Sequence, residues 1–486
     1  MKKILITHSY FLRFDPKQWA TAKPYAPLGT LYGAAVLQQN GYAVSFFDTM
    51  FSHNAEEIIP VLEKERPDIF IIYDDGFNYL TKMCLTNMRD AAFKMARLAK
   101  KMNCTVVFSS SDSTDHFESY LENGADYIIM GEPEGTLLKL VEGIDKKCTD
   151  FSSIDGLAFK LNGDSIKTKR AAVLRELDSI PFPAWDMIDM APYKNMWMKS
   201  SGYFSINMAT TRGCPFKCNW CAKPIYGNRY NSRSPENVVA ELKMLKEKFN
   251  FDHIWFCDDI FGLKPGWVNE FADRLQQQNL KIRFKIQARA DLLADKFEIS
   301  ALSRAGCDTV WMGAESGSQK ILDAMDKGTT IAQIETSTRL MRENGIKPCF
   351  FIQFGYPGET KEDINLTIKM INTLLPDELG ISVSYPLPGT VFYENVKSEL
   401  KQKANWSDSN ELALMFHNTY QPAFYRQLHR YVHKTYRKHL AFENLKKMLL
   451  NPLKTDGITL KRALSSIYYL PSAMINKFKL NQLEKR

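Results

Sequence analysis

Residues 1–145 alternate short apolar runs with segments whose apolar residues recur at helical spacing. Such alternation favours a parallel, doubly wound sheet. Five strands suit the flavodoxin-like order, in which ligands bind at the carboxyl ends of the strands. The predicted strands are Ile4–Thr7, Ala43–Phe47, Ile69–Tyr73, Thr105–Phe108 and Tyr127–Met130, and the predicted helices include Leu28–Gln39, Ala55–Glu65, Met88–Lys101 and Glu134–Val141.

Residues 146–200 interrupt this pattern. Gly156 and Gly163 flank a short apolar stretch, and Pro181 and Pro183 lie two positions apart. Proline has no backbone N–H to donate, so two of them disfavour a regular helix or a central strand. We expect a small hairpin followed by a proline-rich linker.

Alternation resumes over residues 201–395, where six strand–helix units predict a partial (βα)₆ barrel with its reactive face at the carboxyl ends of the strands. The remaining residues, 396–486, are expected to form a helical tail. The predicted barrel strands are Phe204–Thr210, His253–Cys257, Lys281–Gln287, Thr309–Gly313, Pro348–Phe354 and Gly380–Tyr385. The helices between them include Pro235–Lys248, Pro265–Gln277, Lys296–Ala305, Ile331–Asn344 and Lys361–Leu374.

Composition adds a charge asymmetry. The chain carries a net charge of +8, but residues 424–486 hold fourteen Lys and Arg against three Asp and Glu, a net of +11. The other residues therefore carry about −3, and the tail is the basic part. Hydrophobic residues make up 45% of the 486, which excludes a disordered chain. No apolar run is long enough to span a membrane, and the N-terminus lacks a signal-peptide pattern, so we expect a cytoplasmic protein.

Three of the nine cysteines, Cys214, Cys218 and Cys221, lie within eight residues in the pattern Cys-x₃-Cys-x₂-Cys, directly after a predicted strand. Thiolates are soft ligands, suited to zinc or to iron–sulfur clusters. A structural zinc site needs four protein ligands, and the nearest candidates, Cys257 and His253, lie on a separate predicted strand. Three cysteines instead suit a four-iron cluster with one iron left open.

The segment 210–221, with Trp220 just before the third cysteine, resembles the motif of the radical S-adenosylmethionine (SAM) superfamily. The resemblance implies that each cysteine binds one iron and that SAM chelates the fourth. One electron from the cluster would cleave SAM to methionine and a 5′-deoxyadenosyl radical. A one-electron donor such as flavodoxin or ferredoxin is then implied, with a small-molecule substrate and no nucleic-acid partner.

Further segments fit the same resemblance, which implies their roles. Asp258 and Asp259 follow the second barrel strand, where the superfamily contacts the methionine amino group, although many members have Gly-Gly-Glu there. Arg289 is a candidate for the SAM carboxylate, Glu315 for the ribose hydroxyls, and Gly355 belongs to a glycine-rich turn near the adenosyl group. The segment 385–390 completes the barrel pattern.

Segments 27–44 and 124–134 resemble the cobalamin-binding domain that precedes many radical SAM domains. Gly131 would let the backbone approach a ligand closely, since it has no Cβ, and Glu132 would accept hydrogen bonds from the nucleotide tail. The Asp-x-His-x-x-Gly motif that supplies a cobalt ligand in methyl-carrying domains is missing. His8 lacks that context, and we interpret it as an ordinary strand-end histidine. Residues 109–112 replace the usual Gly-Gly turn, and an empty, degenerate domain is the alternative.

Together these features predict a cobalamin-dependent radical SAM enzyme that methylates an unactivated carbon. The alternatives are a radical oxidative cyclase or rearrangement enzyme that delivers no methyl group, and a non-catalytic cobalamin-binding sensor. The resemblance reaches about residue 440 and includes the segment 421–434, which is similar to the region after the barrel in the anaerobic oxidative cyclases. His429 and His433 within it are one helical turn apart and could bind a metal ion. Because no acidic residue or cysteine accompanies them, we expect them to be packed or solvated instead.

The tail has one more pattern. Leu460, Leu464, Ile467 and Tyr468 share a predicted helical face beside Lys461 and Arg462. Met474, Ile475 and Phe478 continue it beyond a break at Pro471, flanked by Lys477 and Lys479. Apolar faces with flanking cations suit the surface of an anionic membrane. Either the tail holds the protein at the inner face of the membrane, or its apolar face packs on the barrel.

Overall fold

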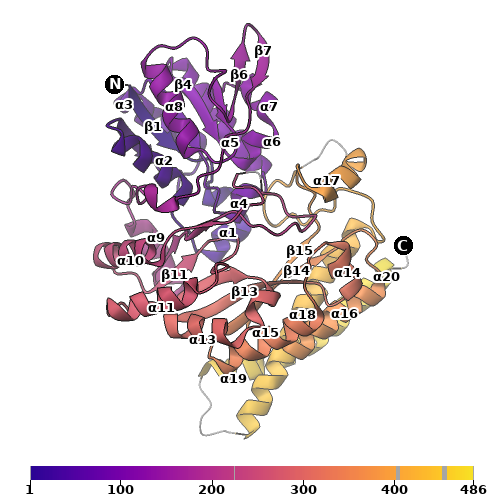
Figure 1. The fold of residues 1–486 in the computed structure, drawn as a ribbon. Coiled ribbons are helices and arrows are strands. Elements are labelled where there is room, and N and C mark those ends of the chain that lie inside the picture. The colour runs from indigo at the N-terminus through magenta and orange to yellow at the C-terminus, as the bar shows by residue number, and fades with distance from the viewer. Residues whose placement is uncertain (1, 224, 401–404, 451–456, 485–486) are drawn as a thin grey trace.

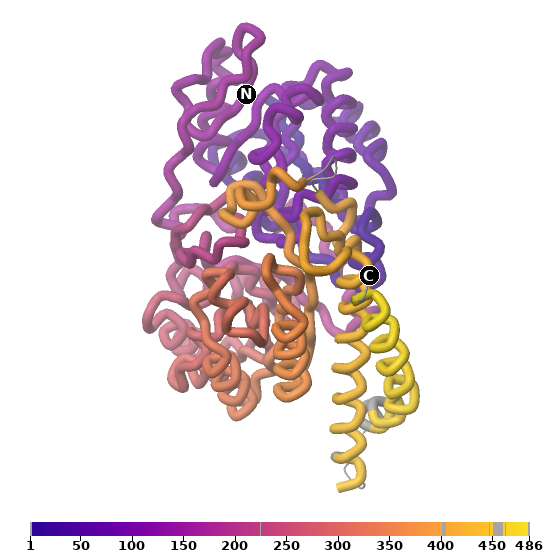
Figure 2. The backbone as a smooth tube through the Cα atoms, turned by 90° about the vertical axis from the view of Figure 1, so that its right-hand side faces the viewer, coloured from indigo at the N-terminus to yellow at the C-terminus, as the bar shows by residue number. Residues whose placement is uncertain are grey.

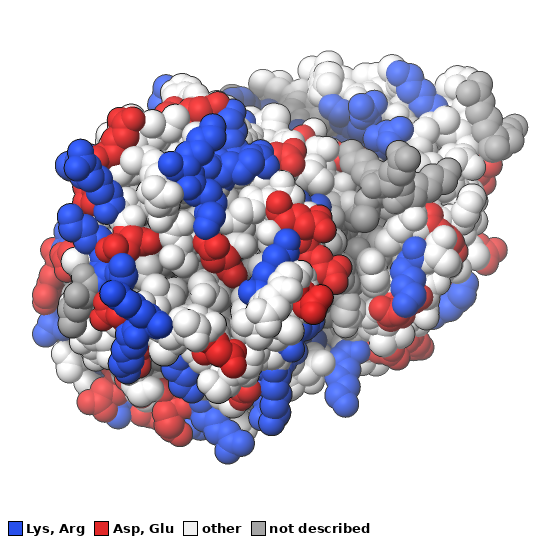
Figure 3. Space-filling model, turned by 90° about the horizontal axis from the view of Figure 1, so that it is seen from above, with Lys and Arg blue, Asp and Glu red and all other residues white. Residues whose placement is uncertain are grey.

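The computed structural model describes residues 2–223, 225–400, 405–450 and 457–484. Two α/β units lie one above the other, and a helical hairpin runs along the side of the lower one (Figures 1 and 2). Seen from above, basic and acidic side chains intermingle over the surface (Figure 3).

The upper unit is a doubly wound sheet with the strand order β2-β1-β3-β4-β5, which confirms the flavodoxin-like prediction. Its strands are β1 (Lys3–Thr7), β2 (Ala43–Phe47), β3 (Ile69–Tyr73), β4 (Thr105–Ser109) and β5 (Tyr127–Ile129). Its helices are α1 (Pro16–Thr21), α2 (Leu28–Gln39), α3 (Ile59–Glu65), α4 (Tyr79–Lys82), α5 (Thr86–Lys101), α6 (Ser111–Asp115), α7 (Phe117–Glu122) and α8 (Glu134–Asp145). The central strand β3 is completely buried, as its continuous apolar run requires.

The predicted hairpin is present as β6 (Leu157–Leu161) and β7 (Asp164–Lys167). It adds to β5 in antiparallel pairing and extends the sheet to seven strands, which the sequence pattern did not indicate. The linker prediction was wrong for residues 191–201, which form helix α9 (Ala191–Ser201). Pro192 lies in its first turn, where no N–H is needed, and Gly202 ends it in a left-handed conformation.

Six parallel strands form the lower unit in the order β15-β14-β13-β12-β11-β8, a partial barrel as predicted. They are β8 (Ser205–Met208), β11 (His253–Phe256), β12 (Phe284–Ala288), β13 (Cys307–Glu315), β14 (Lys347–Phe354) and β15 (Glu378–Val383). A two-stranded ribbon, β9 (Thr211–Arg212) and β10 (Asn231–Ser232), follows β8. The helices are α10 (Pro235–Phe249), α11 (Trp267–Gln277), α12 (Ala290–Leu293), α13 (Lys296–Ala305), α14 (Gln319–Ala324), α15 (Ile331–Glu343), α16 (Lys361–Leu374) and α17 (Val391–Val396).

The tail is helical from residue 422 onward, with α18 (Pro422–Leu450), α19 (Gly457–Leu464) and α20 (Ser466–Glu484). The expectation of a helical region over 396–486 was wrong for residues 405–421, which form no helix. Helix α20 packs along α18 (Figure 2). The predicted break at Pro471 was wrong, because α20 continues through it. Pro471 lies inside this helix, beyond its first turn, so the N–H that it lacks removes the backbone bond to the Ile467 carbonyl oxygen. None of the helices in the described residues is long and apolar enough to cross a membrane.

Candidate functional site

The three clustered cysteines lie on the loop between β9 and β10, directly after the carboxyl end of β8. Gly213 opens this loop with a positive φ of 79°, and a Cβ there would come within 2.3 Å of the Arg229 carbonyl oxygen. Only glycine fits that turn. Cys214 is buried and Cys218 and Cys221 are partly exposed, and all nine cysteines are free thiols. Burial raises the pKa of Cys221 to about 11.

The proposed fourth zinc ligands do not join them. The Cys257 thiol donates to the Met208 carbonyl oxygen at 3.2 Å, and His253 pairs with Ser205 and Asp308. Among the residues described, no three His, Cys, Asp or Glu side chains are arranged to hold a single metal ion. Three free thiols on one loop, each able to bind a different iron, fit an iron–sulfur cluster better than a single metal ion.

Arg289, at the carboxyl end of β12, lies beside this loop. Its Nη1 donates to Cys218 Sγ at 3.7 Å, and its guanidinium lies 3.7 Å from the centroid of the Phe216 ring. Nε and Nη2 are paired with Asp291. The Arg289 guanidinium is therefore already held by Asp291 and Cys218. To bind the SAM carboxylate, as predicted, it would have to share these contacts.

The two aspartates after β11 differ. Asp258 is buried and accepts hydrogen bonds from the backbone N–H groups of Thr210 and Thr211 and from the Thr210 hydroxyl. It therefore fastens the start of the cysteine loop to β11, and burial raises its pKa to about 6. Asp259 is partly exposed and forms an ion pair with Lys82 of α4 at 2.7 Å. Of the two residues predicted to contact the methionine amino group, Asp259 is therefore the more accessible.

Glu315, the last residue of β13, takes a left-handed backbone conformation with φ of 58°. Its carboxylate pairs with Lys327 Nζ at 2.9 Å, and both side chains are buried. Lys327 lies 5.9 Å from the centroid of the Trp220 ring. The buried Trp220 Nε1 and Thr329 Oγ1 have no hydrogen-bond partner among the described residues. Unpaired polar atoms here leave capacity for a polar ligand such as the ribose.

Gly355 ends β14 with φ of 77°, so the predicted glycine-rich turn is present. Its N–H donates to Glu359 Oε2 at 2.7 Å. The neighbouring Tyr356 hydroxyl contacts Asn219 Oδ1 at 2.8 Å, and Asn219 lies between the second and third clustered cysteines. This turn therefore braces the cysteine loop.

In the upper unit, Gly131 follows β5 with φ of 81°. Glu132 is buried and accepts from Arg212 Nη1 at 2.6 Å and from the Leu174 N–H at 2.7 Å. Glu134 also pairs with Arg212, at 2.7 Å. Glu132 thus serves an ion pair between the two units, and its role toward a nucleotide tail stays a prediction.

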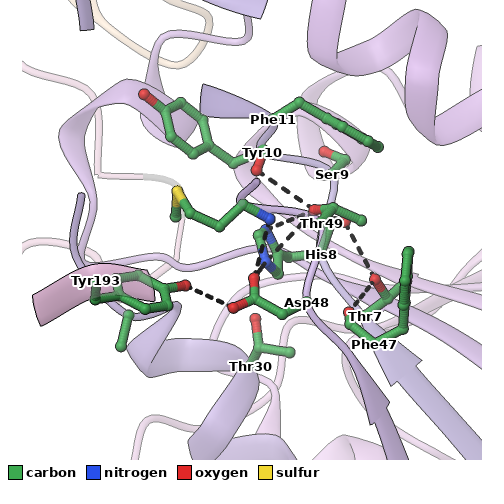
Figure 4. Close-up of polar contacts among 12 residues, drawn as sticks. Thr7, His8, Ser9, Tyr10, Phe11, Thr30, Phe47, Asp48, Thr49 and Tyr193 are labelled. Atoms are coloured by element: carbon green, nitrogen blue, oxygen red, sulfur yellow. Dashed lines mark hydrogen bonds and ion pairs between the residues drawn. The ribbon is translucent and has the colours of Figure 1, made fainter. Parts of the chain in front are cut away.

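Figure 4 shows the edge of the upper sheet around His8. The buried His8 ring contacts Asp48 Oδ1 through Nε2 at 2.8 Å and Thr49 Oγ1 through Nδ1 at 3.1 Å. The Tyr193 hydroxyl donates to the second Asp48 oxygen at 2.7 Å. Asp48 thus holds one ring nitrogen of His8, and the Thr49 hydroxyl, which donates to the His8 carbonyl oxygen, lies beside the ring, 3.1 Å from Nδ1 and 3.4 Å from Nε2.

Residues that follow the carboxyl ends of the two sheets contact one another in two pairs, Lys82 with Asp259 and Glu132 with Arg212. The carboxyl edges of both sheets consequently face each other across the cysteine loop (Figure 1). Sequence reasoning missed Lys82, Lys327 and Arg212. Arg212 carried a signal, since it lies two residues before Cys214, whereas nothing in the local sequence distinguishes the two lysines.

A separate cavity of about 970 Å³ lies far from this loop, between the amino end of β15 and helices α18, α19 and α20. Leu374, Tyr436 and Tyr469 line it together with Arg342 and Arg437. His433 also lines it, and its ring meets the His429 ring edge-on at 4.6 Å between ring centroids. Burial lowers the pKa of His429 to about 4, so the pair is packed in neutral form.

The model of the radical SAM superfamily matches residues 208–371, from the end of β8 through the cysteine loop into α16. The chain contains a radical SAM domain. The chain is 28% identical over 387 residues to an uncharacterized methyltransferase of Pyrococcus horikoshii, covering 78% of this chain and 80% of that one. It is 27% identical over 392 residues to the anaerobic magnesium-protoporphyrin IX monomethyl ester cyclase of Cereibacter sphaeroides, covering 78% of this chain and 62% of the cyclase.

Two solved structures share the fold. The cobalamin-dependent radical SAM enzyme OxsB, with aqua-cobalamin bound, aligns with a TM-score of 0.77 and 16% identity over 98% of this chain and 72% of OxsB. The radical SAM methyltransferase TsrM of Kitasatospora setae, with cobalamin and a [4Fe-4S] cluster bound, aligns with a TM-score of 0.68 and 18% identity over 82% of this chain and 75% of TsrM. The predicted combination of a doubly wound unit, a partial barrel and a helical tail is thereby confirmed.

Proposed function

We propose that this protein is a cobalamin-dependent radical SAM enzyme that methylates an unactivated carbon of a small molecule. The observation that carries the proposal is the meeting of two carboxyl edges, one from a doubly wound sheet and one from a partial barrel, at a loop with three free thiols. Each edge is the usual ligand-binding side of its fold. The relatives named as methyltransferases and the cobalamin-bound OxsB and TsrM support it.

In this proposal Cys214, Cys218 and Cys221 hold a four-iron cluster. When bound, the cluster supplies the electron that cleaves SAM. The chain's own residues orient SAM: Asp259 takes the methionine ammonium, Arg289 the carboxylate and Glu315 the ribose. Gly355 leaves room for the adenosyl group, and the upper unit covers the site and keeps water out.

Cobalamin would lie at the carboxyl edge of the upper sheet, near Gly131, with small residues of the segment 109–112 beside its tail. His8 is buried and held by Asp48 and Thr49, and the Asp-x-His-x-x-Gly motif is missing, so this proposal gives cobalt no histidine ligand. The domain boundaries that go with this reading are residues 1–145 for cobalamin, 146–200 for the hairpin and linker, 201–395 for the radical SAM core and 396–486 for the tail.

The second candidate is a radical oxidative cyclase, favoured by the cyclase relatives at 27% and 25% identity. The two reactions differ in how they use SAM. Methylation consumes two SAM per product and releases S-adenosylhomocysteine, whereas cyclisation without methyl transfer consumes one and releases none. Mass spectrometry of small molecules from cells with and without the gene, grown without oxygen, would identify the substrate. The number of SAM molecules consumed per product could then be counted. The electron donor would be a flavodoxin or ferredoxin.

The cluster is tested by anaerobic reconstitution. We expect about four irons per chain, and loss of both iron and SAM cleavage when Cys214, Cys218 or Cys221 is replaced by Ala. Cys84→Ala is the matched control, a buried free thiol elsewhere in the chain, and should retain both. A Cys218→Ala protein that still cleaves SAM would contradict the assignment.

Cobalamin binding has its own test. Protein supplied with hydroxocobalamin should retain it through gel filtration, and the cobalt(II) form should show no nitrogen splitting from a protein histidine in its electron paramagnetic resonance spectrum. The reason is that the chain lacks the Asp-x-His-x-x-Gly motif and that His8 is buried and paired with Asp48. Protein that retains no cobalamin, or a histidine splitting that His8→Gln removes, would overturn this part of the proposal.

A further inference from the structure

The outer face of the tail carries an unusual row of exposed apolar side chains. Ile467, Pro471, Met474 and Phe478 recur at the four- and three-residue spacing of one helical face, and Tyr468 and Ile475 lie beside them. Ile467 is 77% exposed, Met474 67% and Phe478 65%. Leu460 and Leu464 of α19 continue the row. We call these eight residues the apolar tail face. Single exposed apolar residues are ordinary, but a continuous row of this kind marks an interaction surface.

The opposite face of the same helices is packed. Ala463, Ala473 and Leu480 are buried. Gln427 of α18 donates to Asn476 Oδ1 at 2.9 Å, and Glu484 pairs with Lys361 of α16 at 2.7 Å. The hairpin is therefore docked on the body through one side, while the side chains of the apolar tail face stay exposed. Packing on the barrel, the other expectation for this face, was wrong for these residues.

Cations border the apolar tail face. At 100° per residue, Lys477 and Lys479 fall on its two sides along α20, and Lys461 extends the border along α19; all three are exposed. Lys434 donates to the Tyr468 hydroxyl at 2.9 Å. The side chain of Arg462, predicted beside this face, lies outside the described residues. The nearest acidic groups on these helices, Glu443 and Glu484, are paired with Lys446 and Lys361.

We propose that the apolar tail face binds the surface of a membrane that contains anionic phospholipid. Exposed apolar side chains would enter the boundary between headgroups and acyl chains, and the flanking lysines would meet lipid phosphates. Each basic residue near such a surface strengthens binding to it. Charge decides against a second copy of this chain as the occupant, since residues 424–486 carry a net charge of +11 and a second tail would repel the first.

This surface is separate from the candidate site. None of the residues in the apolar tail face or its border is among those placed around the cysteine loop, which belong to the carboxyl edges of the two sheets. The proposal therefore stands whether the reaction is methylation or cyclisation.

Co-sedimentation of full-length protein with vesicles tests the proposal. Vesicles of phosphatidylcholine with one quarter phosphatidylglycerol should bind the wild type at least tenfold more than phosphatidylcholine alone, and binding should fall as salt rises from 0.1 to 0.5 M. The triple change Ile467→Ser, Met474→Ser and Phe478→Ser should reduce binding at least tenfold, and Lys477→Glu with Lys479→Glu should do the same.

Phe297→Ser is the matched control, because Phe297 is 82% exposed on α13, away from the tail. It should bind vesicles like the wild type. All variants should keep their iron content and melting temperature, which shows that the fold is intact. Wild type that fails to bind, or a triple variant that binds equally well, would overturn the proposal. So would a wild-type dimer that the triple change converts to a monomer, since the face would then be a protein interface.

Discussion

At the scale of single residues, burial of ionisable groups sets the chemistry around the cysteine loop. Glu359 is the clearest case: it is completely buried, it accepts from the Gly355 N–H, and its second oxygen has no hydrogen-bond partner among the described residues. Burial raises its pKa to about 8, with a further increase from Asp363 that Lys320 opposes. The folded protein therefore keeps this carboxyl protonated at neutral pH.

The pKa of Glu359 predicts a pH dependence. Between about pH 4.5 and pH 8 the unfolded chain loses this proton and the folded protein keeps it, so the free energy of unfolding falls as pH rises. The slope from this group approaches about 1.4 kcal/mol per pH unit. Glu359→Gln removes this contribution, so its stability relative to wild type should rise from pH 5 to pH 8, measured by urea unfolding.

Glu362→Gln is the control for this measurement, since Glu362 lies three residues further on, in the first turn of α16, but is exposed. Its stability relative to wild type should not change with pH. A constant difference between Glu359→Gln and wild type from pH 5 to pH 8 would show that Glu359 is ionised in the folded protein.

At the scale of elements, the sequence predicted most of the strands and helices, because their signals are local. Helices α2, α13 and α16 begin and end where the pattern placed them, and α13 and α16 start at the capping side chains of Asp295 and Thr360. Helix α9 was missed because Pro181 and Pro183 were interpreted as the mark of a linker, and the continuity of α20 was missed because Pro471 was interpreted as a break. Pro192 lies in the first turn of α9, where proline costs little, whereas Pro471 lies inside α20 and the helix continues through it.

The candidate site likewise combines residues that local sequence predicts with partners that it does not. The cysteine motif and the positions after each barrel strand are local, so Cys214, Arg289, Glu315 and Gly355 were found. The partners of those residues come from distant segments. Lys82 lies 177 residues from Asp259, and Glu134 lies 78 residues from Arg212. Sequence patterns carry no information about such pairs until the packing of the elements is known.

The ion pair between β9 and α8 gives a prediction at this scale. Arg212 is buried with Glu132 and Glu134 and is surrounded by the rings of Tyr32 and Tyr226. Arg212→Met would leave two buried carboxylates without a cation, which costs about 3–5 kcal/mol. Because Arg212 lies directly before the cysteine loop, the iron content after reconstitution should also fall.

Arg339→Met is the matched control, since Arg339 pairs with Glu343 on the exposed face of α15. Exposed pairs contribute about 0–1 kcal/mol, so the melting temperature and iron content of this variant should match wild type. If the Arg212 and Arg339 variants had the same melting temperature and iron content, the ion pair of Arg212 with Glu132 and Glu134 would not stabilise the cysteine loop.

At the scale of the whole molecule, the chain after the barrel returns to the upper unit. The Trp406 carbonyl oxygen accepts from the Thr86 N–H at 2.9 Å, and Arg89 donates to Asn405 Oδ1 at 3.0 Å. Asp15 accepts from the Ser409 N–H at 3.1 Å. In Figure 2 the orange segment after β15 accordingly lies between the two units. The two units are thus joined by buried pairs at the site and by this returning segment.

Trp406 connects these parts and predicts how the molecule unfolds. Its side chain is 1% exposed, packs on Tyr385 of the barrel at 4.6 Å between ring centroids, and donates from Nε1 to the Ala413 carbonyl oxygen at 2.8 Å. Trp406→Ala would leave a large cavity between the units and cost about 3–5 kcal/mol. Since both units share this contact, calorimetry should show one unfolding transition at a lower temperature. Trp406→Phe keeps the ring contact and should lose less. Two separate transitions, with the lower one alone displaced in the Ala variant, would show that the units unfold independently.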